Sequence, residues 1–145
     1  MAIDQEIYFA ADCVVLTRQG EVLLIQRGNA PFQGKSAFPG GFIETNEEME
    51  TAAARELHEE TGLVIEPGEL ELVFIAGKCG RDPRFRTVSV VYLKLLEQAI
   101  SVQGGDDAAQ AKWFPLDALP DMAFDHLEIL KTILKERSLF PDTAV

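Results

Sequence analysis

The sequence has little of what marks several common classes of protein. Cysteine occurs only twice, as Cys13 and Cys79. The two lie far apart among apolar residues, so we expect both to be buried free thiols in a reducing cytoplasm. No stretch approaches the roughly 20 consecutive apolar residues of a membrane span, and the N-terminus lacks the basic segment and apolar core of a secretory signal. These absences favour a cytoplasmic protein that does not interact with a membrane.

Basic residues are scarce as well. The chain has 13 Lys and Arg against 24 Asp and Glu, for a net charge of −11. Binding to nucleic-acid backbones draws on clustered Lys and Arg, so no nucleic-acid partner is expected. A small phosphorylated ligand is not excluded, because it needs only a few local arginines and a metal ion.

Hydrophobic residues make up 47% of the 145 residues, which is ordinary for a globular protein and enough for one core. We expect residues 1–145 to form a single domain. Apolar runs bounded by turn residues predict strands at 7–17, 22–26, 70–76, 87–96 and 111–114. A helix should begin near Asp125 and end before Pro141. Strands combined with flanking helices indicate an α/β sandwich.

Residues 41–63 form the most distinctive segment. Thr45 and Glu48 match a capping box, which predicts a helix beginning near Asn46. Gly62 stands where a left-handed C-terminal cap is expected. Residues at four-residue spacing predict an apolar stripe on this helix: Met49, Ala53 and Leu57, with Ala52 beside it.

Another face of the same helix is acidic. Glu56, Glu59 and Glu60 stand at i, i+3 and i+4, so their Cβ atoms should lie about 5–6 Å apart. Three neighbouring carboxylates repel one another, and the C-terminal end of a helix does not stabilise negative charge. Hard divalent cations such as Mg²⁺ bind carboxylate oxygens and often join them to substrate phosphates. The alternative is a solvated acidic helix face, the commoner meaning of a run of charges.

The spacing of this segment favours the metal. It resembles the signature of the Nudix hydrolases, with Gly41, five residues, Glu47, seven residues, Arg55-Glu56-Leu57, one residue, Glu59-Glu60, one residue and Gly62-Leu63. The resemblance covers nearly the whole chain. It implies an α/β/α sandwich with a mixed central sheet, in which this segment is a loop–helix–loop. Ser36 stands where the family commonly has a tryptophan before Pro-Gly-Gly.

The resemblance also implies a reaction. Nudix hydrolases cleave nucleoside diphosphates linked to another moiety, using Mg²⁺ or Mn²⁺ and an attacking water. It implies that the metal ligands are Glu56, Glu59 and Glu60, with a backbone carbonyl of Gly40 or Gly41. Arg55 would orient acidic groups of the segment, and Glu47 would belong to the outer part of the site.

The general base stays open between two sets of residues. Glu59 or Glu60 would act by holding a metal-activated water. Asp106 and Asp107 lie in a later loop where many members of the family place an acidic ligand or base. The alternative for Asp106 and Asp107 is an ordinary surface turn, since Gly-Gly-Asp-Asp is normal turn composition.

Substrate selection must come from elsewhere in the chain. Arg27 follows a strand just before the Pro-Gly-Gly turn, and Arg81, Arg84 and Arg86 share one loop. Guanidinium groups bind phosphate through paired hydrogen bonds, although such a loop is often only solvated surface. Candidates for stacking on a base are Phe32, Phe85 and Phe124, while His126 is expected to be structural.

Three functional readings remain. Short motifs around Arg81, Asp106 and His126 resemble bacterial and archaeal ADP-ribose pyrophosphatases, which implies hydrolysis of ADP-ribose to AMP and ribose 5-phosphate. A nucleoside triphosphate or mRNA-cap hydrolase of the same fold is the second reading. The third is a transcription regulator that senses ADP-ribose, but it requires a DNA-binding domain that we do not expect after Val145. Family members are often dimers, so a homodimer also stays open.

Overall fold

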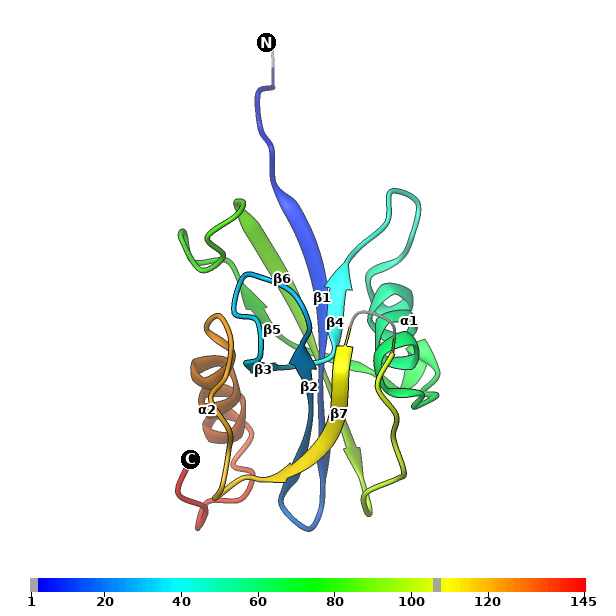
Figure 1. The fold of residues 1–145 in the computed structure, drawn as a ribbon, viewed down its shortest axis with the longest axis vertical. Helices are drawn as coiled ribbons and strands as arrows, with labels where there is room; N and C mark the ends of the chain where they lie inside the picture. The colour runs from blue at the N-terminus through cyan, green and yellow to red at the C-terminus, as the bar shows by residue number, and fades with distance from the viewer. Residues whose placement is uncertain (1–2, 106–107) are drawn as a thin grey trace.

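Two long strands form the centre of the fold. β1 (Tyr8–Thr17) and β6 (Thr87–Leu96) run parallel, with Tyr8 opposite Thr87 at one end and Thr17 opposite Leu96 at the other. The structure is a computed structural model that describes residues 3–105 and 108–145. The residues before β1 extend beyond the sheet (Figure 1). No helix in the described ranges is both long enough and apolar enough to cross a membrane.

Further strands complete a mixed sheet around this pair. All of them pair antiparallel: β2 (Glu21–Arg27) and β4 (Gly40–Phe42) with β1, β3 (Ser36–Ala37) and β7 (Ala108–Pro115) with β2, and β5 (Glu71–Ala76) with β6. The five predicted strands are therefore confirmed. The short strands β3 and β4 were not predicted, and Pro39, which cannot donate a ladder hydrogen bond, separates them.

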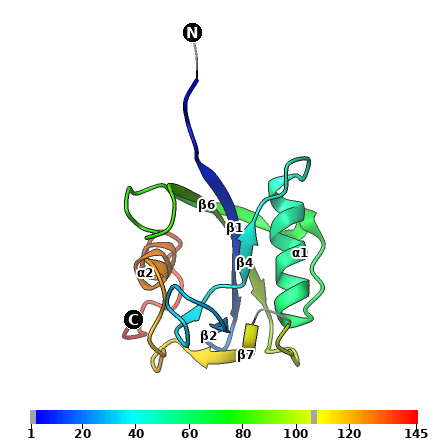
Figure 2. The same cartoon turned by 45° about the horizontal axis from the view of Figure 1, so that its top comes forward.

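Two helices cover opposite faces of the sheet (Figures 1 and 2). They are α1 (Met49–Thr61) and α2 (His126–Glu136). Alternate residues of β1 serve the two layers because successive side chains of a strand point to opposite faces. Val14 and Leu16 join the core beneath α2, whereas Cys13 and Val15 join the core beneath α1. This arrangement confirms the α/β/α sandwich.

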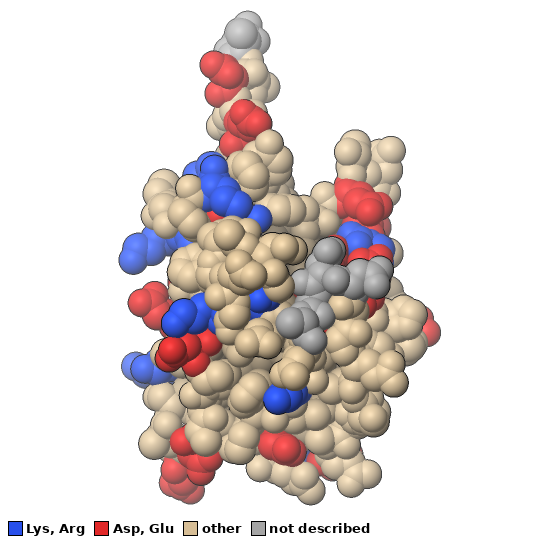
Figure 3. Space-filling model, viewed as in Figure 1, with Lys and Arg blue, Asp and Glu red and all other residues tan. Residues whose placement is uncertain are grey.

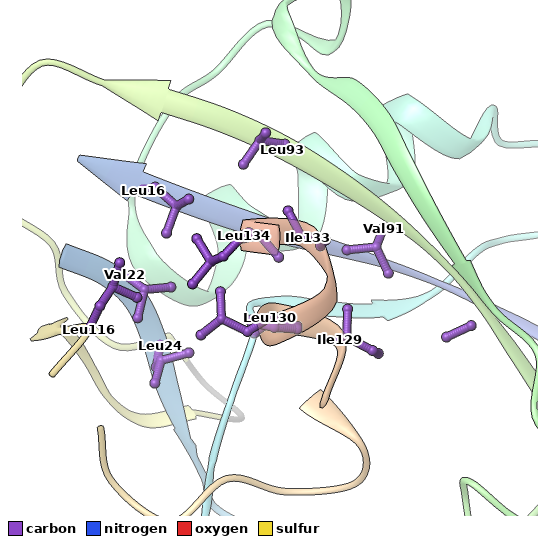
Figure 4. Packing of buried hydrophobic residues seen from close by; sticks show 13 residues of the cluster. Leu16, Val22, Leu24, Val91, Leu93, Leu116, Ile129, Leu130, Ile133 and Leu134 are labelled. Atoms are coloured by element: carbon purple, nitrogen blue, oxygen red, sulfur yellow. The ribbon is translucent and has the colours of Figure 1, made fainter. Parts of the chain in front are cut away.

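The core beneath α2 is built from branched aliphatic side chains. Figure 4 shows Ile129, Leu130, Ile133 and Leu134 of α2 lying against side chains of β1, β2 and β6. Burying each such side chain stabilises the fold by about 1.5–3 kcal/mol. This packing fixes α2 on the face of the sheet formed by β1, β2 and β6.

The predicted start of α1 is wrong. The helix begins at Met49 rather than near Asn46, and its N-cap residue Glu48 makes no side-chain capping bond, so the capping box with Thr45 does not form. Instead, the carboxylate of Glu47, which lies between Thr45 and Glu48 in the sequence, forms an ion pair with Arg55 of α1. Tertiary contacts therefore replace the local cap.

Three smaller expectations have mixed outcomes. Gly62 is confirmed as a left-handed cap, with φ of 77° and its N–H donating to the carbonyl of His58. Met49 is 40% exposed, so the buried stripe of α1 begins at Ala52 rather than at Met49. Cys13 is buried as expected, but Cys79 is exposed, because it lies in the loop after β5.

Candidate active site

The acidic face of α1 lies against the Pro-Gly-Gly turn. The N–H of Gly40 donates to Oε1 of Glu60 over 2.8 Å. Gly41 is so close to Glu56 that a Cβ atom there would stand 2.5 Å from its carboxyl carbon. Only a residue without a side chain permits this approach. The structure thus brings Gly41, Glu56 and Glu60 together, as the sequence predicted.

Arg55 connects the acidic residues of this segment. Its Nε donates to Oε2 of Glu47 over 2.6 Å, and its Nη1 donates to Oε1 of Glu56 over 2.8 Å. The same Nη1 lies 3.3 Å from Oε2 of Glu59. Hydrogen bonds from Arg55 lower the pKa of Glu47. The guanidinium therefore holds Glu47 and Glu56 in fixed orientations, while the Glu59 side chain, 56% exposed, stands at the rim.

Burial disfavours the charged forms of the Glu56 and Glu60 side chains, and the protein only partly offsets this effect. Burial raises the pKa of Glu60 to about 8, against the lowering effect of the Gly40 hydrogen bond. Burial also raises the pKa of Glu56, against the effect of Arg55. A charged carboxylate removed from water is unfavourable unless a cation accompanies it. A hard divalent ion with oxygen ligands fits this donor set.

The glutamates are not already arranged as a complete metal cage. Within residues 3–105 and 108–145, no three Asp, Glu, His or Cys side chains form a preassembled metal cluster. Glu59 turns toward Arg55 at the rim, whereas Glu56 and Glu60 face the glycine turn. The residues that fit a metal ion in the present arrangement are therefore Glu56 and Glu60, with a carbonyl of the glycine turn.

A cleft opens in front of these carboxylates. Its outer part has a volume of about 640 Å³, and its wall includes Glu56, Glu59 and Glu60. A smaller inner cavity of about 140 Å³ continues toward the α2 layer. Both parts share the following residues: Ile25, Arg27, Gly40, Gly41, Phe42, Glu60 and Arg84. A ligand held at Glu60 can therefore extend into either part.

Two of the four predicted arginines lie at the junction of the two parts. Arg27 donates from Nε to the carbonyl of Pro31 over 2.7 Å, and its guanidinium lies 4.9 Å from the centre of the Phe124 ring. Arg84 binds both carboxylate oxygens of Asp82, at 3.1 and 2.9 Å, and lies near three phenylalanine rings. Burial, followed by the positive charge of Arg84, lowers the pKa of Arg27. An anion between these two arginines would relieve their repulsion.

The other two arginines are placed differently. The Arg81 side chain is only 4% exposed and binds both oxygens of Asp125, at 3.0 and 2.8 Å, and the hydroxyl of Ser89. It reaches the inner cavity, but its donors are engaged. Arg86 is exposed and lines neither part of the cleft. The basic atoms visible in Figure 3 form separate groups rather than one continuous patch.

Asp106 and Asp107 lie outside the described residues. Gly105, immediately before them, lines the outer cleft. A Cβ atom on Gly105 would stand 1.9 Å from the backbone carbonyl oxygen of Glu59. The loop that leads to the two aspartates thus closely approaches the C-terminal end of the acidic face.

The sequence reasoning missed Asp12, which lies in the floor of the inner cavity. Burial raises its pKa to about 7. The neighbouring His126 makes contacts of the structural kind that was expected: its Nδ1 accepts the N–H of Phe38 over 3.1 Å, and its ring stacks on the Phe38 ring. Burial lowers the pKa of His126 to about 3, so the imidazole is neutral. A single charged residue inside an otherwise apolar strand was the available signal for Asp12.

Comparison with known proteins agrees with this geometry. The family model of the NUDIX domain matches residues 8–133. The chain belongs to the Nudix hydrolase family. Its relatives include an ADP-ribose pyrophosphatase of Methanocaldococcus jannaschii, 40% identical over 83% of this chain and 70% of the relative. This relationship confirms the enzyme class expected from residues 41–63.

Two further Nudix relatives are informative. An ADPR-responsive transcriptional repressor of Acinetobacter baylyi is 38% identical over 78% of this chain and 46% of its own length. The solved structure of a bifunctional NMN adenylyltransferase/ADP ribose pyrophosphatase from Francisella tularensis, complexed with AMP and a manganese ion, superposes with a TM-score of 0.83 at 28% identity. That comparison covers 93% of this chain and 43% of the other. The chain thus spans less than half of both proteins.

Proposed function

We propose that this protein is a metal-dependent pyrophosphohydrolase that cleaves ADP-ribose to AMP and ribose 5-phosphate. The observation that carries the proposal is the convergence of Glu56, Glu60 and the glycine turn on a cleft that is also lined by Arg27 and Arg84. One side of the cleft attracts a cation and the other side attracts an anion. A diphosphate with a bound divalent ion satisfies both sides. The archaeal relative supports ADP-ribose as the substrate.

Glu56 and Glu60 would hold Mg²⁺ or Mn²⁺ together with the carbonyl of Gly40 or Gly41. When bound, the ion would neutralise diphosphate oxygens and lower the pKa of the attacking water. Arg55 fixes the direction of the Glu56 carboxylate, and the Gly40 N–H fixes that of Glu60. Glu59, at the exposed rim, is free to join the ligands by turning away from Arg55.

Arg27 and Arg84 would bind the diphosphate. Nε of Arg27 is engaged with Pro31, which leaves its two terminal nitrogens without a partner among the described residues. Arg84 likewise keeps Nη1 available, because Asp82 binds its Nε and Nη2. Charge-assisted hydrogen bonds from such groups are about twice as strong as neutral ones. The general base remains a choice between Glu59 or Glu60 and the pair Asp106 and Asp107.

A substrate panel tests the proposal. Purified protein is incubated with Mg²⁺ and ADP-ribose, an oxidised deoxynucleoside triphosphate or a cap dinucleotide, and the products are quantified by chromatography. We expect AMP from ADP-ribose and no product after chelation of the metal. Release from the oxidised nucleotide without AMP from ADP-ribose would instead establish the triphosphate reading.

The repressor relative supports a second candidate, an ADP-ribose sensor that binds without hydrolysis. Calorimetry and a gel-shift assay on random-sequence DNA at physiological salt distinguish the two. Tight ADP-ribose binding that persists for hours with Mg²⁺, together with DNA binding, would establish the sensor. Binding followed by AMP release would exclude it.

A homodimer also remains a proposal. Ile7, Tyr8 and Phe9 are 36%, 36% and 50% exposed at the start of β1. Apolar residues that project in this way are common at contacts between subunits. Light scattering at two protein concentrations tests it, and a monomer mass at both would refute it.

A further inference from the structure

Asp12 is a buried carboxylate that faces a cavity. The residue is 6% exposed and lines the inner cavity of about 140 Å³. The hydroxyl of Ser89 lies close enough to the Asp12 carboxylate to lower its pKa by hydrogen bonding, against the larger effect of burial. Nε2 of the neutral His126 lies 3.9 Å away. A carboxylate has about four accepting positions, so Asp12 keeps positions that face the cavity and can accept hydrogen bonds from a ligand.

Arg81 and His126 do not fill those positions. Arg81 is held by both oxygens of Asp125 and by Ser89, so its guanidinium does not bind Asp12. His126 is neutral, and because its Nδ1 accepts the N–H of Phe38, its proton is on Nε2, which lies 3.9 Å from Oδ2 of Asp12 and is too far for a hydrogen bond. These contacts fix the surroundings of Asp12 and leave accepting positions on its oxygens for the cavity.

Asp12 is also close to the reaction centre. It lies opposite Gly40 in the pairing of β1 with β4, and a Cβ atom on Gly40 would stand 2.0 Å from Oδ1 of Asp12. The same glycine donates its N–H to Glu60. Only Gly40 separates Asp12 from the Glu60 carboxylate, so a ligand group in the inner cavity would lie next to a diphosphate bound at Glu60.

The walls of the cavity indicate the chemistry of that group. Ser89 contributes a hydroxyl beside Asp12, and Thr87, whose hydroxyl donates to Asp82, lines the same cavity. Phe38 and Phe124 contribute apolar ring surface. A ring with hydroxyl groups at its edge and C–H groups on its faces complements this combination. A cavity of this size has room for one such ring.

We propose that Asp12 is a specificity-determining residue that accepts hydrogen bonds from hydroxyls of a sugar joined directly to the diphosphate. This inference rests on the proposed function. A carboxyl group offers at least one accepting oxygen whether or not it is protonated. Sites built to hydrogen-bond a substrate hydroxyl reject analogues that lack it, because the buried acceptor is then left without a partner.

The test compares the wild-type protein with Asp12→Ala on a set of substrates. The set contains ADP-ribose, analogues that lack ring hydroxyls in the terminal ribose, an analogue that lacks the 2′-hydroxyl of the adenosine ribose, and the methyl ester of ADP. We expect Asp12→Ala to lower kcat/KM for ADP-ribose about 10- to 100-fold. The loss should shrink for whichever deoxygenated analogue removes the recognised hydroxyls, which identifies the ribose that occupies the cavity.

A matched control variant is Cys13→Ala. Cys13 neighbours Asp12 in β1, but its side chain points to the α1 layer. Its replacement should change kcat/KM by the same factor for every substrate. Unfolding curves of both variants establish that they are folded, and binding of the same compounds without added metal is measured by calorimetry, so the comparison does not depend on turnover.

The outcomes separate the two proposals. An equal loss on all substrates, or no loss on any, would overturn the role of Asp12, because neither depends on a sugar hydroxyl. If wild-type protein binds the sugar compounds selectively through Asp12 but never cleaves them, the pyrophosphohydrolase proposal fails while the inference stands. Absence of any selective binding or cleavage by the wild-type protein overturns the inference as well.

Discussion

Replacing Glu60 with Gln should make the metal-free protein more stable and the enzyme nearly inactive. The glutamine keeps the shape of the side chain and an oxygen that accepts the Gly40 N–H, now 2.8 Å from Glu60. It removes the negative charge that burial disfavours. The substitution therefore separates the effect of the charge from the effect of the packing.

The size of the stability change follows from the pKa. Raising the pKa of Glu60 from its ordinary value of 4.5 to about 8 corresponds to about 5 kcal/mol at 1.36 kcal/mol per pKa unit. Glu60 borders a water-accessible cleft, so solvent screening reduces this, and we expect about 2 kcal/mol. Between pH 4.5 and about 8 the native state binds more protons than the unfolded chain, so the contribution of Glu60 to stability falls as pH rises through this window.

The assay is urea unfolding in a chelator at pH 6 and pH 8.5. The variant should exceed the wild type by about 2 kcal/mol at pH 8.5 and by less at pH 6. Adding Mg²⁺ should stabilise the wild type but not the variant, because a ligand that binds only the native state raises its stability. The exposed Glu59 provides the control, since Glu59→Gln should change stability by less than about 0.5 kcal/mol. A less stable Glu60→Gln variant at pH 8.5, or a difference that does not vary with pH, would refute the reasoning.

Three further predictions concern the contacts around the cleft. Arg55→Lys should lower kcat about 10- to 100-fold in steady-state kinetics, because an ammonium cannot bind several carboxylates in the fixed geometry of the guanidinium; unchanged kcat would contradict an orienting role. Gly105→Ala should lower kcat/KM at least about 10-fold with a nearly unchanged unfolding midpoint, since its Cβ would stand 1.9 Å from the carbonyl oxygen of Glu59 and displace the loop; normal kcat/KM would show that the loop does not contribute. Arg84→Ala should raise KM for ADP-ribose about 10- to 100-fold, whereas Arg86→Ala, outside the cleft, should change KM less than about twofold; equal effects would argue against a phosphate contact at Arg84.

The sequence predicted the parts of the site that depend on local spacing. Glu56 and Glu60 are separated by one helical turn, so any helix through them places both on one face. Gly62 ended that helix as expected, because a left-handed cap is a property of a few neighbouring residues. The start of the helix was missed because Glu47 pairs with Glu44 and with Arg55 instead of leaving the chain to a cap formed by Thr45 and Glu48.

The parts that depend on tertiary contacts were less accessible. All four arginines were candidates for a phosphate contact in the sequence. In the structure, Arg27 and Arg84 lie where the outer cleft meets the inner cavity, Arg81 binds Asp125, and Arg86 lies outside the cleft. Nothing in the spacing of a loop specifies which side chain meets an acid from a helix 44 residues away. Such distinctions require the fold.

The two glycines of the Pro-Gly-Gly turn meet different demands. A side chain on Gly41 would collide with the Glu56 carboxylate, whereas one on Gly40 would collide with the Asp12 carboxylate on the other side of the strand. Successive residues of a strand point to opposite faces, so one short turn approaches the acidic helix with one residue and the inner cavity with the next. This geometry connects the carboxylates proposed to bind the metal ion with Asp12, which we propose recognises the sugar. In ADP-ribose the diphosphate is bonded to the sugar, so a diphosphate bound at the ion would place that sugar beside Asp12.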